Sequence, residues 1–307
     1  MTAPTSAAGT RPGADAGTRT TTGSRTAPRS PHAPEGPEMT TTELDAGPAA
    51  MGGTVTTTPD DEATPVRGLT TWRRLRIELR KSVDTVSGAV LTAVTLGAAP
   101  LLVVAAIVAE GAAGTTVSFV LGAGSIAAAL LLPVLTSLLI TSEWGQGSIV
   151  STFAMDHRRG RVMAAKIAAG LVVGLVVALS CLVVAIAVSA VAGVDLGSAG
   201  ELVCVCAGVT AALLLYAALG SAWGAATLST PLAIVIGLAG PQVVNSLELM
   251  LGDRFAEIAP WLAFSQAVGD LTQGTVASWP HLLTAVGLWI VAPMAVGVWR
   301  VRRADVS

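Results

Sequence analysis

Residues 162–191 read VMAAKIAAGLVVGLVVALSCLVVAIAVSAV, an apolar run with one charged side chain, Lys166. A bilayer core about 30 Å thick needs about 20 apolar residues at a rise of about 1.5 Å per residue. Because the run exceeds that length, it indicates a membrane-spanning helix that tilts or extends beyond the bilayer. Lys166 lies near one end of the run, where its long side chain is expected to snorkel toward water.

Five further runs in the chain have a comparable length and apolar character. They cover residues 86–109, 117–140, 202–228, 232–251 and 281–299. Charged residues make up only 12% of the chain, against about 25% in soluble domains. The sequence therefore predicts an all-α, polytopic membrane protein with six transmembrane helices over residues 86–303. Gly240 and Pro241 interrupt the fifth run and predict a kink there.

Residues 1–66 are rich in Thr, Pro, Ala and Gly and have almost no large apolar side chains. Such a segment buries too little surface to offset its ordering entropy, so it is predicted to be a disordered tail. No apolar core follows its early arginines, which argues against a secretory signal. Met39 and Met51 lie inside it and are, with Met1, candidate starts of translation.

Residues 67–85 include GLTTWRRLRIELRK, in which Trp72, Leu75 and Leu79 follow helical spacing between basic residues. This pattern predicts an amphipathic helix lying at the membrane interface. A simple basic topology anchor is the alternative interpretation. The residues that define the helix are Trp72, Arg73, Arg76, Glu78 and Lys81.

Basic residues predict the orientation, because Lys and Arg gather in cytoplasmic loops. Arginines precede the first run, form the cluster Arg158, Arg159 and Arg161 between the second and third, and follow the sixth. Carboxylates dominate the loops on the other side. Both termini are therefore expected in the cytoplasm, and the protein in the cytoplasmic membrane.

Residues 248–280, before the sixth run, have too many apolar residues for a solvated loop and too few to span. They predict a re-entrant outer segment of one or two short helices. Trp261 and Trp279 are expected at the depth of the lipid headgroups.

No motif for catalysis is present. The chain lacks a GxxxxGK[ST] phosphate loop, an HExxH zinc motif and a GxSxG nucleophile motif. Cys181, Cys204 and Cys206 have no CxxC spacing and are interpreted as small apolar residues. We therefore expect no enzyme activity, metal, cofactor or nucleic-acid partner in this chain.

The span interiors contain no Asp, Glu or Arg. Ion-driven transporters usually need an ionisable or polar site near the midplane, so energy for transport would have to enter from outside the membrane. The polar stretch TSEWGQGSIVSTF, residues 141–153, joins two spans on the expected cytoplasmic side. Motion of this segment would move both spans.

At this segment the chain resembles type-2 ATP-binding-cassette (ABC) permeases, particularly actinobacterial exporters. The similar stretches are SEWGQGSIVSTFAMDHRRGRVMAAKIAAG, IELRKSVDTVSG, YAALGSAWGAATLSTPLAIVI, APWLAFSQAV and HLLTAVGLWIVAPMAVGVWRVRR. Their order over residues 72–303 carries the resemblance.

The resemblance implies a permease subunit that pairs with a second copy or a relative and with separate ATPase subunits, which bind the ATP. It implies a coupling segment over residues 141–161 whose ATPase contacts are Glu143, Trp144, Gln146, Ser148 and Thr152. The basic cluster at residues 158–161 either anchors the topology or contacts the ATPase. The alternative function is an ATP-independent membrane protein: an immunity or resistance factor, a scaffold or a secondary carrier.

Two GxxxG patterns, Gly170 with Gly174 and Gly220 with Gly224, predict close helix contacts. Whether they join helices within one chain or between two chains is open.

Overall fold

The computed structural model describes residues 71–145 and 159–303. Of these residues 88% are helical, and none of them forms a strand. The elements are α1 (Thr71–Asp84), α2 (Val86–Glu110), α3 (Val117–Gly145), α5 (Arg159–Val191), α6 (Ala199–Thr227), α7 (Thr230–Leu251), α8 (Asp253–Ala256), α9 (Ala259–Leu262), α10 (Phe264–Thr272), α11 (Trp279–Val286), the π-helical η1 (Gly287–Val291) and α12 (Ala292–Arg303).

Within the described residues, six helices are long and apolar enough to cross a membrane. They are α2, α3, α5, α6, α7 and the continuous run formed by α11, η1 and α12. This confirms the all-α, six-span prediction. Helix α7 continues through Pro241, the residue at which a kink was predicted. The predicted disordered tail, residues 1–66, lies outside the described residues.

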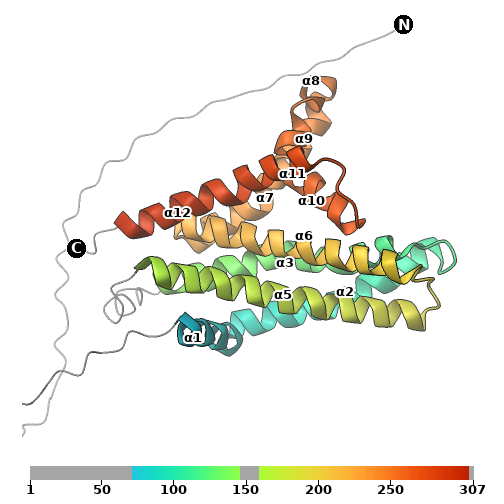
Figure 1. Cartoon of the computed structure of the whole chain (residues 1–307), viewed down its shortest axis with the longest axis horizontal. Coiled ribbons are helices and arrows are strands. Elements are labelled where there is room, and N and C mark those ends of the chain that lie inside the picture. The colour runs from blue at the N-terminus through green and yellow to red at the C-terminus, as the bar shows by residue number, and fades with distance from the viewer. Residues whose placement is uncertain (1–70, 146–158, 304–307) are drawn as a thin grey trace, which may run out of the picture. The chain divides into compact units, whose positions relative to one another are not determined.

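The spans form two groups that share α6. Helices α2, α3, α5 and α6 run side by side, whereas α7 and the α11–α12 run diverge from α6, with α10 between α6 and α11 (Figure 1). One apolar core lies among α2, α3, α5 and α6, and a second among α6, α10, α11 and η1. A third joins α3, α5, α6 and α12. Helix α6 thus contributes to every one of these three cores.

Small residues bring α6 very close to its neighbours. A Cβ atom on Gly220 would lie 2.1 Å from the carbonyl oxygen of Pro133 on α3, and one on Gly174 of α5 would lie 2.7 Å from the Cβ of Ala217. Ser137 Oγ also donates to the Gly220 carbonyl over 3.0 Å. Both GxxxG patterns therefore mediate contacts between helices of the same chain.

Helix α1 crosses the ends of the spans. It is seen nearly end-on in Figure 1, whereas α2, α3, α5 and α6 run across the picture. Leu75 and Leu79 are half-buried, while Trp72 and Arg76 are exposed. This arrangement agrees with an amphipathic helix lying along the membrane surface.

The segment between α7 and α11 contains three short helices, α8, α9 and α10, where one or two were predicted. Phe264 and Val268 of α10 are buried in the second core. The extra breaks follow from local chemistry, because Gly252 ends α7 with φ of +50° and Pro260 begins a new helical turn. Trp261 and Trp279 are both exposed, at 43% and 63%.

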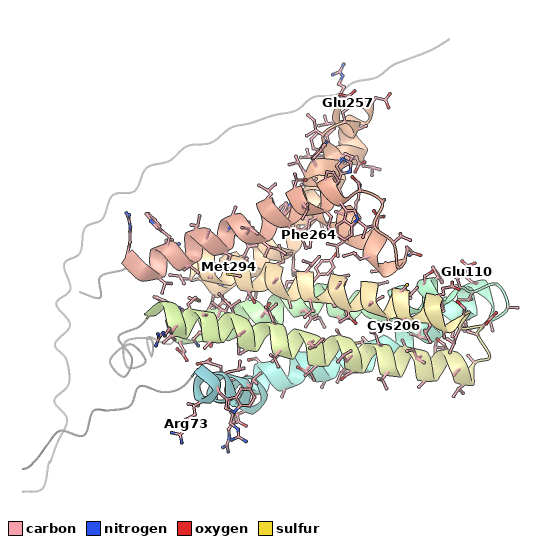
Figure 2. All side chains as sticks on the ribbon, in the orientation of Figure 1. Arg73, Glu110, Cys206, Glu257, Phe264 and Met294 are labelled. Atoms are coloured by element: carbon pink, nitrogen blue, oxygen red, sulfur yellow. The ribbon has the colours of Figure 1, made fainter. Side chains whose placement is uncertain are left out.

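Basic and acidic side chains lie at opposite ends of the bundle formed by α2, α3, α5 and α6. The arginines of α1 and Arg161 lie at one end, whereas Glu110 lies at the other, as Figure 2 shows for Arg73 and Glu110. Because the chain reverses at each loop, Arg300 and Arg303 return to the end that holds α1. The basic loops predicted to share one side therefore do share one end of the molecule.

The contact between α3 and α6 gives a stability prediction. Gly220→Ala should lower the free energy of unfolding by about 1–3 kcal/mol, because its new methyl group meets backbone that cannot yield. Gly97→Ala on α2 is the matched control, since nothing lies within 4 Å of its Cβ position. Thermal unfolding of the purified variants in detergent measures both. Equal unfolding midpoints would contradict the close approach.

Candidate functional site: a buried ion-pair triad

A lysine is enclosed between two glutamates where α1, α3 and α5 meet. Lys166 Nζ lies 3.0 Å from Glu78 Oε2 and 3.0 Å from Glu143 Oε1. The side chains are 2%, 8% and 10% exposed, respectively. We call these three residues the triad, and the end of the molecule that contains them the triad end.

Each member of the triad comes from a different helix. Glu78 lies on the face of α1 that also carries Leu75 and Leu79, three and one residues away. Glu143 is two residues before the end of α3, and Lys166 is in the second turn of α5. The triad therefore ties the surface helix to both spans that flank residues 146–158.

The expectation that Lys166 snorkels to water is wrong. Its side chain is directed inward, because two carboxylates offer charge-assisted hydrogen bonds in a site of low dielectric. Removing one partner from such a buried ion pair costs about 3–5 kcal/mol, although replacing a whole ionic cluster with apolar groups is often neutral. The triad is therefore better suited to fixing how three helices fit together than to adding stability.

The predicted coupling residues divide into two sets. Glu143 is buried against Lys166, and Trp144 is half-buried and packs against the third core. Gln146, Ser148 and Thr152 lie outside the described residues. Their contacts with an ATPase, and those of Glu143 and Trp144, stay predictions.

The basic cluster and α1 supply exposed charges at the triad end, in addition to Arg300 and Arg303 of α12. Arg161 is exposed at the start of α5, whereas Arg158 and the side chain of Arg159 lie outside the described part of the structure. On α1, Trp72 and Arg73 are exposed, as is Arg76. The position of the Lys81 side chain is not described. Glu78 is the one predicted helix residue among those described that turns into the protein.

Further polar contacts join the helix ends near the triad. Thr141 Oγ1 of α3 lies 2.6 Å from Thr230 Oγ1 of α7, and Arg300 of α12 donates to the Ala226 carbonyl of α6. Leu228, between α6 and α7, adopts a left-handed conformation with φ of +53°, and its N–H donates to the Gly224 carbonyl. The Thr141–Thr230 and Arg300–Ala226 contacts could not be predicted from sequence, because their partners are 89 and 74 residues apart along the chain.

The chemistry of the triad is electrostatic and mechanical. No group of three or more His, Cys, Asp or Glu among residues 71–145 and 159–303 is placed to hold a metal ion. The triad brings one buried ammonium group together with two carboxylates. Its ion pairs can form or break as α1, α3 and α5 move relative to one another.

The triad gives a second prediction. Lys166→Met should destabilise the protein by about 3–5 kcal/mol, because it leaves two carboxylates without their buried ammonium. Arg80→Gln is the control, since the Arg80–Asp84 pair is 84% and 66% exposed and is expected to contribute less than about 1 kcal/mol. Thermal unfolding in detergent measures the difference.

A triple variant tests whether charge is the cause. Glu78→Gln and Glu143→Gln combined with Lys166→Met remove all three charges, and should recover part of the lost stability. If the triple variant is less stable than Lys166→Met alone, the electrostatic account is wrong.

The structure thus establishes a polytopic membrane protein with an ion-pair triad at one end. Comparison of the chain with protein-family models and with curated proteins finds no match.

Proposed function

We propose that this chain is the membrane-spanning permease subunit of an ABC exporter. It would pair with a second permease copy and with separate ATPase subunits that bind and hydrolyse ATP. The resemblance carried by Ser142–Gly170 and by four further stretches in the same order supports this proposal. The chain itself would have no catalytic role.

The observation that carries the proposal is the position of the triad. Residues 146–158 connect α3 to α5, and Glu143 and Lys166 pair on either side of that connection. A displacement of residues 146–158 would therefore move α3 and α5 together, because the 3.0 Å contact between Glu143 and Lys166 links the two helices. Glu78 would pass the same displacement to α1, and α1 leads directly into α2.

The proposed orientation places the triad end in the cytoplasm. The arginines at this end support it, because basic loops are retained on the cytoplasmic side. An ATPase could then reach residues 146–158, and both termini would be cytoplasmic.

Cysteine labelling tests this orientation. In a background without Cys181, Cys204 and Cys206, Glu110→Cys should react with a membrane-impermeant maleimide on intact cells, whereas Arg161→Cys should react only after lysis. Both native side chains are exposed, so accessibility within the protein is matched. Labelling of Arg161→Cys on intact cells would refute the proposed coupling.

The role of the triad can be tested after the ATPase is identified by copurification and reconstituted with the permease. Lys166→Met should retain ATPase binding but lower transport-coupled ATP turnover roughly 2- to 30-fold, the range for residues that transmit coupling. Arg80→Gln should leave turnover unchanged, because its pair is exposed. Turnover is measured in proteoliposomes at equal permease content.

Two outcomes would favour the ATP-independent alternative. One is a chain that binds no ABC ATPase when purified from its native membrane. The other is full biological activity after Gln146→Ala and Thr152→Ala are combined. ATP hydrolysis by the purified chain alone would exclude the proposed division of labour.

A further inference from the structure

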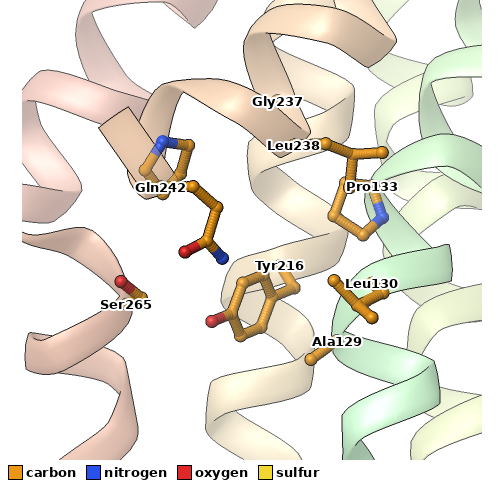
Figure 3. Close-up of a pocket in the computed structure, with 9 residues that line it drawn as sticks. Ala129, Leu130, Pro133, Tyr216, Gly237, Leu238, Gln242 and Ser265 are labelled. Atoms are coloured by element: carbon orange, nitrogen blue, oxygen red, sulfur yellow. The ribbon is translucent and has the colours of Figure 1, made fainter. Parts of the chain in front are cut away.

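A pocket lies where two proline-containing spans face each other. Pro133 of α3 and Pro241 of α7 both line it, with Tyr216 of α6 and Ser265 of α10 (Figure 3). The empty space between these side chains is about 330 Å³ with its open part included. Both prolines lie near the middle of their spans, far from the triad.

The pocket has a polar side and an apolar side. Figure 3 shows the Gln242 amide and the hydroxyls of Tyr216 and Ser265 on one side, and Leu130 and Pro133 on the other. Figure 3 also places Leu238 near Pro133. No Asp, Glu, Lys, Arg or His lines the pocket. A charged ligand would therefore lack a counter-ion here, which favours a neutral, amphiphilic one.

Hydrogen-bonding capacity is left over on the polar side. Asn245 Nδ2 donates to Gln242 Oε1 over 3.3 Å and to Ser265 Oγ over 2.7 Å, while Ser265 donates back to Asn245 Oδ1. Within the described chain, neither Gln242 Nε2 nor the Tyr216 hydroxyl has a hydrogen-bond partner. These two groups offer N–H and O–H donors to a ligand acceptor such as a carbonyl.

The two prolines add acceptors. A proline has no N–H, so the carbonyl four residues earlier receives no helix hydrogen bond from it. Those carbonyls belong to Ala129 and Gly237, and both residues line the pocket. Spare acceptors are costly in a bilayer, which supplies no water to satisfy them. A hydroxyl or N–H on the ligand would satisfy them.

We infer that this pocket binds a neutral amphiphile whose polar end carries a carbonyl together with a hydroxyl or N–H. The carbonyl accepts from Gln242 and Tyr216, the ligand's own donor reaches the acceptors near the prolines, and the apolar part lies along Leu130 and Leu238. The identification of this ligand as the transported cargo rests on the proposed transport function. The inference that the pocket binds the ligand does not depend on that function.

A polar row leads away from the pocket along α7. Gln242, Asn245 and Glu248 recur every three residues, and α10 faces the last two with Ser265 and Gln266. Gln266 Nε2 donates to Glu248 Oε2. The row extends almost to the end of α7 at Leu251 and gives the polar end of a ligand successive partners outside the pocket.

The single tyrosine of the chain makes the pocket directly observable. Tyr216 is the only Tyr in the sequence, so 3-fluorotyrosine introduces one ¹⁹F resonance, at the pocket itself. Protein in a maltoside detergent, which has no ester or amide, is titrated with 1-oleoylglycerol. We expect a saturable shift of that resonance, and no such shift with 1-octadecene, which has the chain but no polar end.

Variants assign the binding to the pocket. Gln242→Leu should weaken the apparent affinity for 1-oleoylglycerol about 2- to 12-fold, the factor for one neutral hydrogen bond. Ser246→Ala, on the same helix but outside the pocket lining, is the matched control and should bind normally. Gly237→Ala adds a methyl group at a position 3.9 Å from the Pro133 Cβ, so it should fold and still reduce binding by narrowing the pocket.

The inference is overturned if 1-oleoylglycerol gives no saturable shift, if 1-octadecene gives the same shift, or if neither Gln242→Leu nor Gly237→Ala weakens binding. The measurement needs no ATPase. Saturable binding by a chain that recruits no ATPase would therefore support the pocket while refuting the proposed export function.

Discussion

The ammonium group of Lys166, with a carboxylate oxygen 3.0 Å away on each of two sides, fixes where three helices meet. Apolar contacts alone tolerate sliding and rotation of one helix on another, because lipid tails and leucine side chains are equally apolar. A buried charge has far fewer acceptable positions, since any displacement leaves it without its counter-ion. The ends of α1, α3 and α5 therefore have one favoured arrangement.

Helix α6 has the complementary role. It contributes to three apolar cores. Its glycines also let the backbones of α3 and α6 approach so closely that no space is left for a Cβ atom at Gly220. Helices α2 and α7 have the smallest buried shares among the six spans. The interior of the molecule is thus organised around α6, while the least covered spans lie at its periphery. If the export proposal is correct, these two spans offer the largest uncovered share of their surface to a second copy.

Most of the fold could be predicted from sequence because each span satisfies its own backbone hydrogen bonds and needs only length and apolar composition to be recognised. Residues 86–109, for example, were predicted as a span and form α2, which ends at Glu110. The triad could not be predicted in this way. Glu78 and Lys166 are 88 residues apart in the sequence. Helical periodicity predicts which face of its own helix a residue occupies, but it does not predict which other helix packs against that face.

The same limit applies to the glycine patterns and to the pocket. Gly220 could be recognised as a site of close approach, but its partner, Pro133, could not. Pro241 could be recognised in the sequence as an interruption of the fifth span. Only the arrangement of α3, α6, α7 and α10 in space shows that Tyr216 and Ser265 complete one site with it.

The joint between α6 and α7 has a consequence for the biogenesis of the protein. Only Leu228 and Ser229 separate the two helices, and Leu228 is held in a left-handed turn by its bond to Gly224. Helix α7 is the least apolar of the six spans, and it carries a proline and two amides in the membrane. Such a segment partitions poorly by itself. Because so short a joint does not let the two helices insert separately, α6 and α7 would leave the translocon together as a helical hairpin. The apolar surface of α6 would then favour the transfer of the more polar α7 into the lipid.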